Sequence, residues 1–325
     1  MLSNKSFLIT GGTGSFGQTL IKHLIDTDVA RIVVFSRDEA KQHFMRIAYP
    51  DERIHFIIGD TRNESSVKRA LKGINFVFHA AALKQVPAGE NFPWEFVQTN
   101  VFGSNNLLTN LDSAGVEKAV FLSTDKAVYP VNAMGMSKAL MEKLVRSENY
   151  NLSSIPLITR YGNVIGSRGS VIPAFIESIK KTGSVEITDE NMTRFMMSLD
   201  QSVALVLYAL KYGASGDLFV QKAPSASVKV LVDALEIIFQ RKIERKFVGV
   251  RPGEKIHESL LTAEEYYNSI ESDQYFQVPR IVLPSNRNTK QFVDYSSNTT
   301  HQLEVEDLSN LLLTIPEITQ LISNR

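Results

Sequence analysis

Short apolar runs alternate with amphipathic stretches along the first 160 residues of the chain. The runs have the length of buried parallel strands, and they lie at residues 6–10, 31–35, 54–58, 76–79, 119–123 and 157–160. After the first run, Leu20, Ile21, Leu24 and Ile25 have the spacing of one helix face. This alternation of strands and helices predicts an α/β fold built on a doubly wound parallel sheet.

A long helix is predicted between the fourth and fifth strands, and a smaller lobe after the sixth. The pattern of residues 93–111 is helical, and Asn100 within it favours a hydrogen bond to a buried group. Later residues follow a less regular pattern, although one further helix and strand are expected to return to the first lobe. We therefore expect a larger domain over residues 1–165, with returning segments near 195–222, and a smaller lobe with a C-terminal tail over 166–325.

Composition narrows the classes of function. The 325 residues carry 35 basic and 35 acidic side chains, so a formal net charge of zero favours neither nucleic acid nor an anionic membrane as partner. The chain has no Cys, which excludes disulfides, thiolate metal sites and a cysteine nucleophile. No apolar run approaches the roughly 18 residues needed to span a bilayer. We expect a cytoplasmic protein without a metal site.

A glycine-rich loop, Gly11-Gly12-Thr13-Gly14-Ser15-Phe16-Gly17, separates the first strand from the first helix. Glycine is needed there because the turn requires unusual φ angles and the backbone must approach a pyrophosphate closely. The N–H groups at the start of the helix then face the phosphates. Strand, loop and helix together predict a dinucleotide site that includes Gly11, Thr13, Gly14, Ser15, Phe16 and Gly17.

The end of the second strand bears on the choice of dinucleotide. An NAD site usually places a carboxylate there, whereas Ser36 and Arg37 offer a hydroxyl and a guanidinium that suit the 2′-phosphate of NADP. Asp38 remains able to bind a ribose, so NAD stays open. Asp60, after the third strand, either accepts a hydrogen bond from the adenine amino group or caps the following helix.

Further cofactor contacts are expected beyond the strand ends. Three alanines after the fourth strand let backbone lie against a cofactor, whereas His79 before them is expected to be a core histidine. The remaining candidates for cofactor binding are Lys41, Ala80, Ala81, Ala82, Lys84, Asn100, Ser123, Lys138, Tyr161 and Asn163.

The fifth strand leads into Thr124-Asp125-Lys126, and a helical pattern opens soon afterwards with Met134 and Lys138. Met134 and Lys138 are four residues apart and therefore share one helix face. An acid and two amines thus converge beyond the carboxyl end of a strand, where open α/β sheets bind their ligands.

This arrangement resembles the active site of the extended short-chain dehydrogenase/reductases, which have a Rossmann domain and a Y-x-x-x-K helix. In that family the lysine holds the nicotinamide ribose and lowers the pKa of the tyrosine, which then takes a proton from a substrate hydroxyl. Lys138 matches the lysine. The tyrosine position is Met134, which has no acid–base function.

A narrower resemblance is to the UDP-N-acetylglucosamine 4,6-dehydratases of surface-polysaccharide pathways, and within them to the 5-inverting, capsule-type branch with methionine at the tyrosine position. It rests on Thr124-Asp125-Lys126-Ala127 and on residues 35–39, 79–84, 160–164, 167–173, 192–195, 251–255 and 295–297. The resemblance implies NADP, UDP-N-acetylglucosamine and a homo-oligomer such as a hexamer. It also implies substrate contacts from Lys84, Asn163, Val171, Arg194, Arg251 and Glu254.

The resemblance further implies a dehydration in which Asp125 is the general acid and Lys126 the base at sugar carbon 5. Thr124 would bind the 4-hydroxyl and Lys138 the nicotinamide ribose. Either Lys126, acting twice, or an ordered water deprotonates the 4-hydroxyl. Two other functions stay open: a UDP-sugar 4-epimerase on the same fold, and a non-catalytic nucleotide-binding sensor, which the methionine at position 134 suggests.

Overall fold

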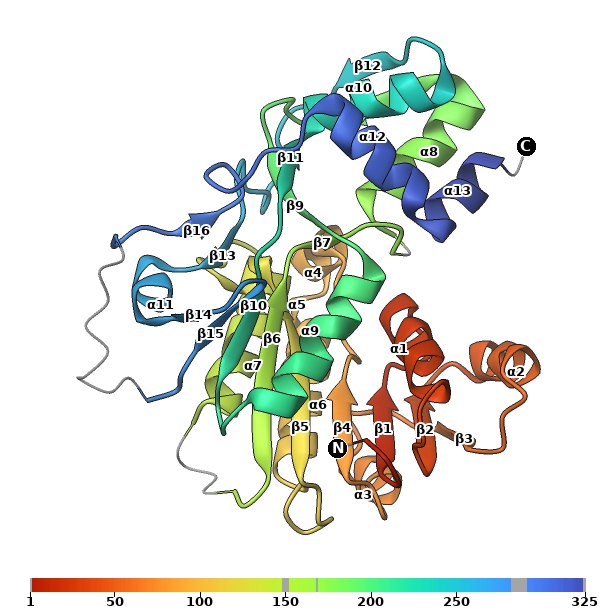
Figure 1. Cartoon of the computed structure of the whole chain (residues 1–325), viewed down its shortest axis with the longest axis vertical. Helices are drawn as coiled ribbons and strands as arrows, with labels where there is room; N and C mark the ends of the chain where they lie inside the picture. Colours follow the sequence, from red (N-terminus) through yellow and green to blue (C-terminus); the bar gives the residue numbers. More distant parts are fainter. Residues whose placement is uncertain (1, 148–151, 168, 282–290, 324–325) are drawn as a thin grey trace.

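The computed structural model of the chain places a large sheet, covered by helices on both faces, beside a smaller helical lobe (Figure 1). The structure describes residues 2–147, 152–167, 169–281 and 291–323, so Arg168 of the 167–173 motif lies outside the described residues. Within these ranges, no helix combines the length and the apolar character that a membrane span requires.

Nine strands form the main sheet in the order β14-β15-β10-β6-β5-β4-β1-β2-β3. Seven of them are parallel: β1 Ser6–Thr10, β2 Arg31–Ser36, β3 Ile54–Ile58, β4 Phe76–His79, β5 Lys118–Thr124, β6 Ile155–Tyr161 and β10 Leu218–Gln221. The hairpin of β14 (Ile270–Glu271) and β15 (Tyr275–Val278) adds two antiparallel strands at the β10 edge. The predicted α/β fold with a large, doubly wound parallel sheet is confirmed.

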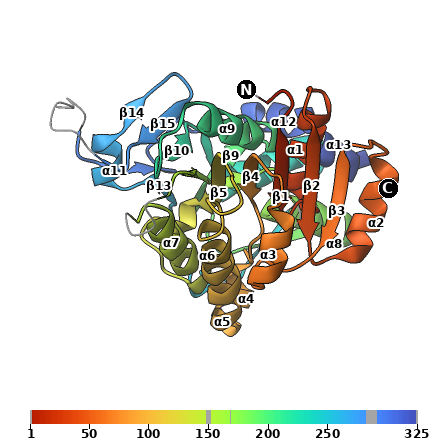
Figure 2. The ribbon, with the colours of Figure 1, turned by 90° about the horizontal axis from the view of Figure 1, so that it is seen from below.

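Helices cover both faces of this sheet, as Figure 2 shows. On one face α1 (Ser15–Ile25) and α9 (Leu199–Tyr212) bury an apolar cluster, and on the other α3 (Glu64–Ala70), α6 (Gly103–Leu108) and α7 (Ala133–Val145) bury a second one. Strands covered on both faces need apolar side chains at nearly every position, which is the pattern seen in the sequence. Helix α2 (Glu39–Ala48) lies beside β2 and β3.

The prediction of one continuous helix over residues 93–111 is wrong, because the structure has three helical segments there and the last of them ends at Leu108. After α4 (Val86–Asn91), the chain forms α5 (Pro93–Phe96), a π-helix (Val97–Phe102) and then α6, which ends at Leu108. Asn100 lies fully buried in the π-helical turn. Its side-chain amide bonds the Leu83 backbone N–H and carbonyl and the Ser137 hydroxyl at 2.9–3.0 Å. The prediction that Asn100 bonds a buried group is thus confirmed, and its partners are the Leu83 backbone in the loop after β4 and Ser137 in α7.

The smaller lobe has its own apolar core, shared by its helices and a two-stranded sheet. Its elements are α8 (Val171–Thr182), β8 (Ser184–Ile187), α10 (Val228–Phe239), β12 (Glu244–Phe247), α12 (Val305–Thr314) and α13 (Pro316–Ser323). Leu308, Leu312 and Ile318 of the C-terminal helices are fully buried in this core. The apolar face of these helices therefore packs on the chain's own lobe.

Short strands connect the two lobes. A three-stranded sheet contains β7 (Asn163–Val164), β9 (Thr193–Met197) and β11 (Ser225–Ser227), and a two-stranded one contains β13 (Ser259–Leu261) and β16 (Tyr295–Ser296). Strand β13, which precedes α11 (Ala263–Asn268), contacts the 3₁₀ turn η2 (Asp125–Ala127) after β5. This contact brings the second half of the chain to the carboxyl end of the parallel sheet.

The start of α7 lies unusually close to that turn. A Cβ at Gly135 would lie 2.2 Å from the Lys126 carbonyl oxygen, and the Asn132 side chain caps the helix by accepting from the Gly135 N–H at 2.8 Å. We predict that Gly135→Ala destabilises the protein by about 1–3 kcal/mol, because the backbone must shift to make room. Urea unfolding measures the change.

The control for that prediction is Gly89→Ala in α4, where an added Cβ meets only ordinary contacts of 3.4 Å. We expect its free energy of unfolding to stay near that of the unchanged protein. Equal stabilities of the two variants would show that the α7 start has room to relax.

Candidate active site at the carboxyl ends of the strands

The glycine-rich loop has the close backbone approaches that a dinucleotide site requires. Gly11 has a φ of +66°, and a Cβ on it would lie 2.8 Å from the Ala81 Cα. At the start of α1, a Cβ on Gly17 would lie 2.5 Å from Gly12. No side chain caps this helix at Gly14. The loop therefore brings backbone without Cβ atoms at four glycines to a helix N-terminus, which fits a pyrophosphate.

At the end of β2, Ser36 and Asp38 are tied into the local structure. The Ser36 and Thr13 hydroxyl oxygens lie 3.0 Å apart, which joins this strand end to the glycine-rich loop. The Asp38 carboxylate caps α2 by accepting from the Lys41 N–H at 2.9 Å, and the Lys41 ammonium lies 2.6 Å away. Arg37 is half exposed, with its guanidinium 3.7 Å from Asp60.

Asp60 does not cap the next helix. That cap is Asn63, which accepts from the Ser66 N–H at 2.8 Å. Asp60 instead accepts from the Arg62 N–H and guanidinium at 3.0 and 2.9 Å. Burial alone would raise the pKa of Asp60, but these hydrogen bonds outweigh burial and lower it. The capping alternative is therefore wrong.

His79 is a core histidine, as expected. It is fully buried, and its ring nitrogens lie 2.7 Å from the Thr10 hydroxyl and 2.9 Å from the Ser104 hydroxyl. Burial lowers the pKa of His79 to about 3, with Lys138 contributing in the same direction. The ring is neutral at ordinary pH and joins β4 to β1 and α6.

A buried charge cluster lies at the end of β5. Asp125 is fully buried, and its Oδ1 accepts from the Thr124 hydroxyl at 2.7 Å and from the Lys126 ammonium at 3.1 Å. The same ammonium lies 3.2 Å from Oε1 of Glu258, which is 2% exposed. One lysine thus bridges two carboxylates that come from distant parts of the chain.

The two carboxylates differ from ordinary buried acids because each has an oxygen without a hydrogen bond. Among the residues that the structure describes, none donates to Asp125 Oδ2 or Glu258 Oε2. Burial by itself would lower the pKa of Lys126, but the two carboxylates outweigh burial and the opposing Arg194, and the pKa is raised. The site therefore presents an ammonium and two acceptor oxygens.

Glu258 is the site residue that sequence reasoning missed. It follows the 251–255 motif and directly precedes the short apolar strand β13, so a carboxylate at a strand edge was the available signal. That signal is weak, because most carboxylates beside short strands are solvated. Its partner Lys126 lies far away in sequence.

Helix α7 forms another side of the site. Met134 and Lys138 are both buried, and the Lys138 ammonium donates to the Leu122 carbonyl at 2.7 Å. Burial lowers the pKa of Lys138 to about 8, against an opposing effect of Glu142. The Tyr161 ring packs against the cluster that α1 and α9 form on the other face of the sheet. It is therefore not placed to substitute for a phenol at position 134.

Among the expected substrate contacts, Arg194 is close enough to Lys126 to oppose the rise of its pKa. Its guanidinium donates to the carbonyls of Lys255 and Ile256 at 3.0 and 3.1 Å. Arg251 is half exposed and lies 3.7 Å from Glu186. The remaining candidates lie on different elements: Lys84 in the loop after β4, Asn163 in β7, Val171 at the start of α8, and Glu254, which accepts from the Arg251 N–H at 3.4 Å.

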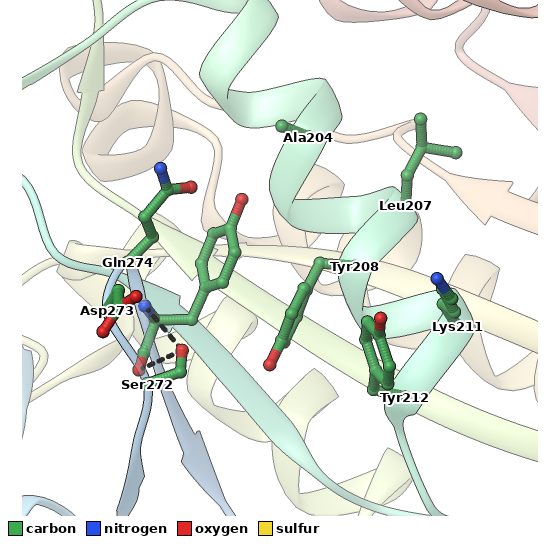
Figure 3. Close-up of a pocket in the computed structure, with 9 residues that line it drawn as sticks. Ala204, Leu207, Tyr208, Lys211, Tyr212, Ser272, Asp273 and Gln274 are labelled. Atoms are coloured by element: carbon green, nitrogen blue, oxygen red, sulfur yellow. Dashed lines mark hydrogen bonds between the residues drawn. The ribbon is translucent and has the colours of Figure 1, made fainter.

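A pocket of about 490 Å³ lies elsewhere, between α9 and the β14–β15 hairpin. Figure 3 shows its tyrosines on α9, where the rings of Tyr208 and Tyr212 have centroids 4.6 Å apart. Its lining includes no residue of the glycine-rich loop, the charge cluster or α7. We therefore place the candidate active site at the strand ends rather than in this pocket.

Comparisons with known proteins agree with this fold. Relatives named UDP-glucose 4-epimerase, from Rickettsia rickettsii and Rickettsia bellii, are 45% and 44% identical over the whole of both chains. The X-ray structure of Pen from Bacillus thuringiensis is 34% identical, covers 99% of each chain and has a TM-score of 0.91.

A structure of the dTDP-glucose 4,6-dehydratase DesIV from Streptomyces venezuelae, 22% identical, covers 77% of this chain and 86% of its own with a TM-score of 0.69 and supports the fold alone. A family model described as polysaccharide biosynthesis protein matches residues 7–280. The chain therefore belongs to the polysaccharide-biosynthesis family of extended short-chain dehydrogenase/reductases.

Proposed function

We propose that the chain is an NADP-dependent UDP-N-acetylglucosamine 4,6-dehydratase that inverts carbon 5 and supplies a UDP-4-keto-6-deoxy sugar for surface polysaccharide. The observation that carries the proposal is the acid–amine pair at the end of β5, in which Asp125 is fully buried and the Lys126 side chain is 22% exposed. Elimination needs an acid and a base at neighbouring sugar carbons at the same time, and adjacent groups in one buried site can supply both.

A nicotinamide held on the glycine-rich loop would supply the hydride chemistry, out of sugar carbon 4 and back to carbon 6. In this proposal the Thr124 hydroxyl orients the 4-hydroxyl, and Asp125 gives a proton to the departing 6-hydroxyl. Lys126 takes the proton of carbon 5, and carbon 5 is later reprotonated from the opposite face by solvent, to which the protein releases one proton in exchange. The proton lost from the 4-hydroxyl replaces the one that Asp125 gives to the leaving water, so the protein ends in its starting protonation state.

The cofactor would lie on the glycine-rich loop, with Lys138 at the nicotinamide ribose. NADP is favoured over NAD because Arg37 offers a half-exposed guanidinium at the end of β2, while the Asp38 carboxylate is engaged in capping α2. NAD remains the alternative, since the Ser36 hydroxyl suits either dinucleotide.

Arg37→Ala should weaken NADP binding and leave NAD binding nearly unchanged. The loss expected for one charged hydrogen-bond partner is about 1.5–3 kcal/mol, which is roughly 10- to 100-fold in Kd. Titration calorimetry with both dinucleotides measures it. Lys68→Ala removes an exposed cation that pairs with Glu64 on α3 and serves as control. Equal losses of affinity for NADP and NAD would contradict the assignment of Arg37 to the 2′-phosphate.

A 4-epimerase is the second candidate, because the Rickettsia relatives carry that name. Epimerisation needs oxidation at carbon 4 but no elimination, so it gives no reason for the acid–amine pair Asp125–Lys126. Both reactions need a base for the 4-hydroxyl, so the methionine at position 134 does not distinguish them. The acid–amine pair is therefore the feature that favours dehydration.

The purified protein with NADP and UDP-N-acetylglucosamine should yield a product lighter by one water. Mass spectrometry of the nucleotide sugar reads this directly, and NMR assigns the configuration at carbon 5. A product of unchanged mass with inverted carbon 4 would establish the epimerase. NADP binding without turnover of any UDP-hexose would establish the sensor.

Lys126→Arg should fold and bind NADP but lose turnover by about 10²–10⁴-fold, the usual contribution of a general base. Arginine keeps the cation between Asp125 and Glu258, whereas its guanidinium does not give up a proton. The more drastic Lys126→Ala also leaves the two carboxylates unpaired. Steady-state kinetics at saturating substrate and a cofactor titration separate chemistry from binding, and near-normal turnover in either variant would contradict the base assignment.

A further inference from the structure

The segment that carries Glu258 is fastened to the turn after β5 along its length. The Gly253 carbonyl accepts from the Asn132 amide at 2.7 Å, and the Lys255 ammonium donates to the Val128 carbonyl. Arg194 holds the intervening backbone. The backbone that leads to Glu258 is therefore held by hydrogen bonds to the turn after β5 and to Arg194.

The Glu258 backbone is fixed as well. Its N–H donates to the Ser297 hydroxyl at 2.9 Å, and its carbonyl accepts from the Ser297 N–H at 2.7 Å. The carboxylate is 97% buried, with Oε1 at 3.2 Å from the Lys126 ammonium and Oε2 at 3.5 Å from that of Lys255. Oε2 accepts no hydrogen bond within the described ranges. A buried carboxylate in this state has capacity for a proton.

Lys126 has to be a neutral amine before it can take a proton from carbon 5, yet its surroundings hold it as an ammonium. Its proton needs an acceptor inside the site. Asp125 contacts the same ammonium through Oδ1. In the proposed reaction, however, Asp125 gives a proton to the 6-hydroxyl and therefore has to hold that proton itself, so it does not accept a second one from Lys126. Glu258 contacts the same ammonium and has no other assigned task.

We propose, on the basis of the proposed function above, that Glu258 is the proton acceptor that converts Lys126 into the active base. An N–H bond of Lys126 breaks and an O–H bond forms on Glu258. The freed lone pair of the amine then takes the proton of sugar carbon 5, which leaves Lys126 as an ammonium again. Carbon 5 is reprotonated from the opposite face by solvent, and Glu258 releases its proton to solvent, so both groups return to their starting states. Glu258 acts through Lys126 and is a positioning residue in this scheme, since it need not touch the sugar.

The test is Glu258→Gln in the full chain, which keeps the shape and the hydrogen-bond acceptor but holds no proton. We expect turnover at pH 7 to fall by about 100-fold while NADP binding is unchanged. Because Lys126 would then have to lose its proton to solvent, turnover should rise steeply with pH in the variant and stay nearly flat in the unchanged enzyme. Glu258→Asp should recover part of the loss.

The pH profile distinguishes this role from a structural ion pair. The charged groups facing Lys126 are Asp125 in η2, Glu258 before β13 and Arg194 in β9, with Lys255 beside Glu258. Removal of one negative charge alone would ease deprotonation of Lys126 and leave turnover equal or higher. A Glu258→Gln variant that matches the unchanged enzyme across the pH range therefore overturns the inference.

Glu117→Gln is the control, since Glu117 is a carboxylate that pairs with Lys5 at 2.7 Å rather than with Lys126. We expect its pH profile to keep the shape of the unchanged enzyme. If the unchanged enzyme forms no dehydrated product, the proposed function itself fails. If it dehydrates and Glu258→Gln does so equally well, only the role of Glu258 fails.

Discussion

The structure around the candidate site depends on one cation held between two buried carboxylates. Burying Asp125 and Glu258 as anions is costly unless each finds a positive partner, and Lys126 serves both. Such a cluster is stable only in close geometry. The fastening of residues 253–258 to the turn after β5, and the glycine at position 135 that lets α7 approach that turn, are what this geometry requires.

A second network of buried charged side chains links β5, β6, α7 and α11 beside the Asp125–Lys126–Glu258 cluster. Arg160 in β6 pairs with Glu142 in α7 and with Glu265 in α11, and Ser123 at the end of β5 donates to the same Glu142 carboxylate. Glu142 is one helical turn beyond Lys138, so the network fixes the helix that carries the lysine. The end of β5, strand β6, helix α7 and helix α11 are therefore joined through buried charges.

Local features of the site could be predicted from the sequence, and its tertiary partners could not. The glycine-rich loop and the β5–α7 unit are continuous in sequence, so their spacing predicts their positions. Glu258 pairs with a lysine far away in the chain, and no local pattern marks that contact. Asn63 rather than Asp60 caps α3, and Asn100 lies in a π-helical turn, because tertiary hydrogen bonds outweigh local propensity there.

The methionine at position 134 agrees with the proposal that Asp125 and Lys126, rather than a phenol, transfer protons. In the tyrosine-containing relatives of the fold, the lysine of the Y-x-x-x-K helix lowers a phenol pKa, whereas here the Lys138 amine donates to the Leu122 carbonyl beside a buried thioether. In the proposed reaction, proton transfer therefore falls to Asp125 and Lys126. A shared ammonium with two acceptor carboxylates can hold an acid and a base together, which elimination requires and simple oxidation at carbon 4 does not.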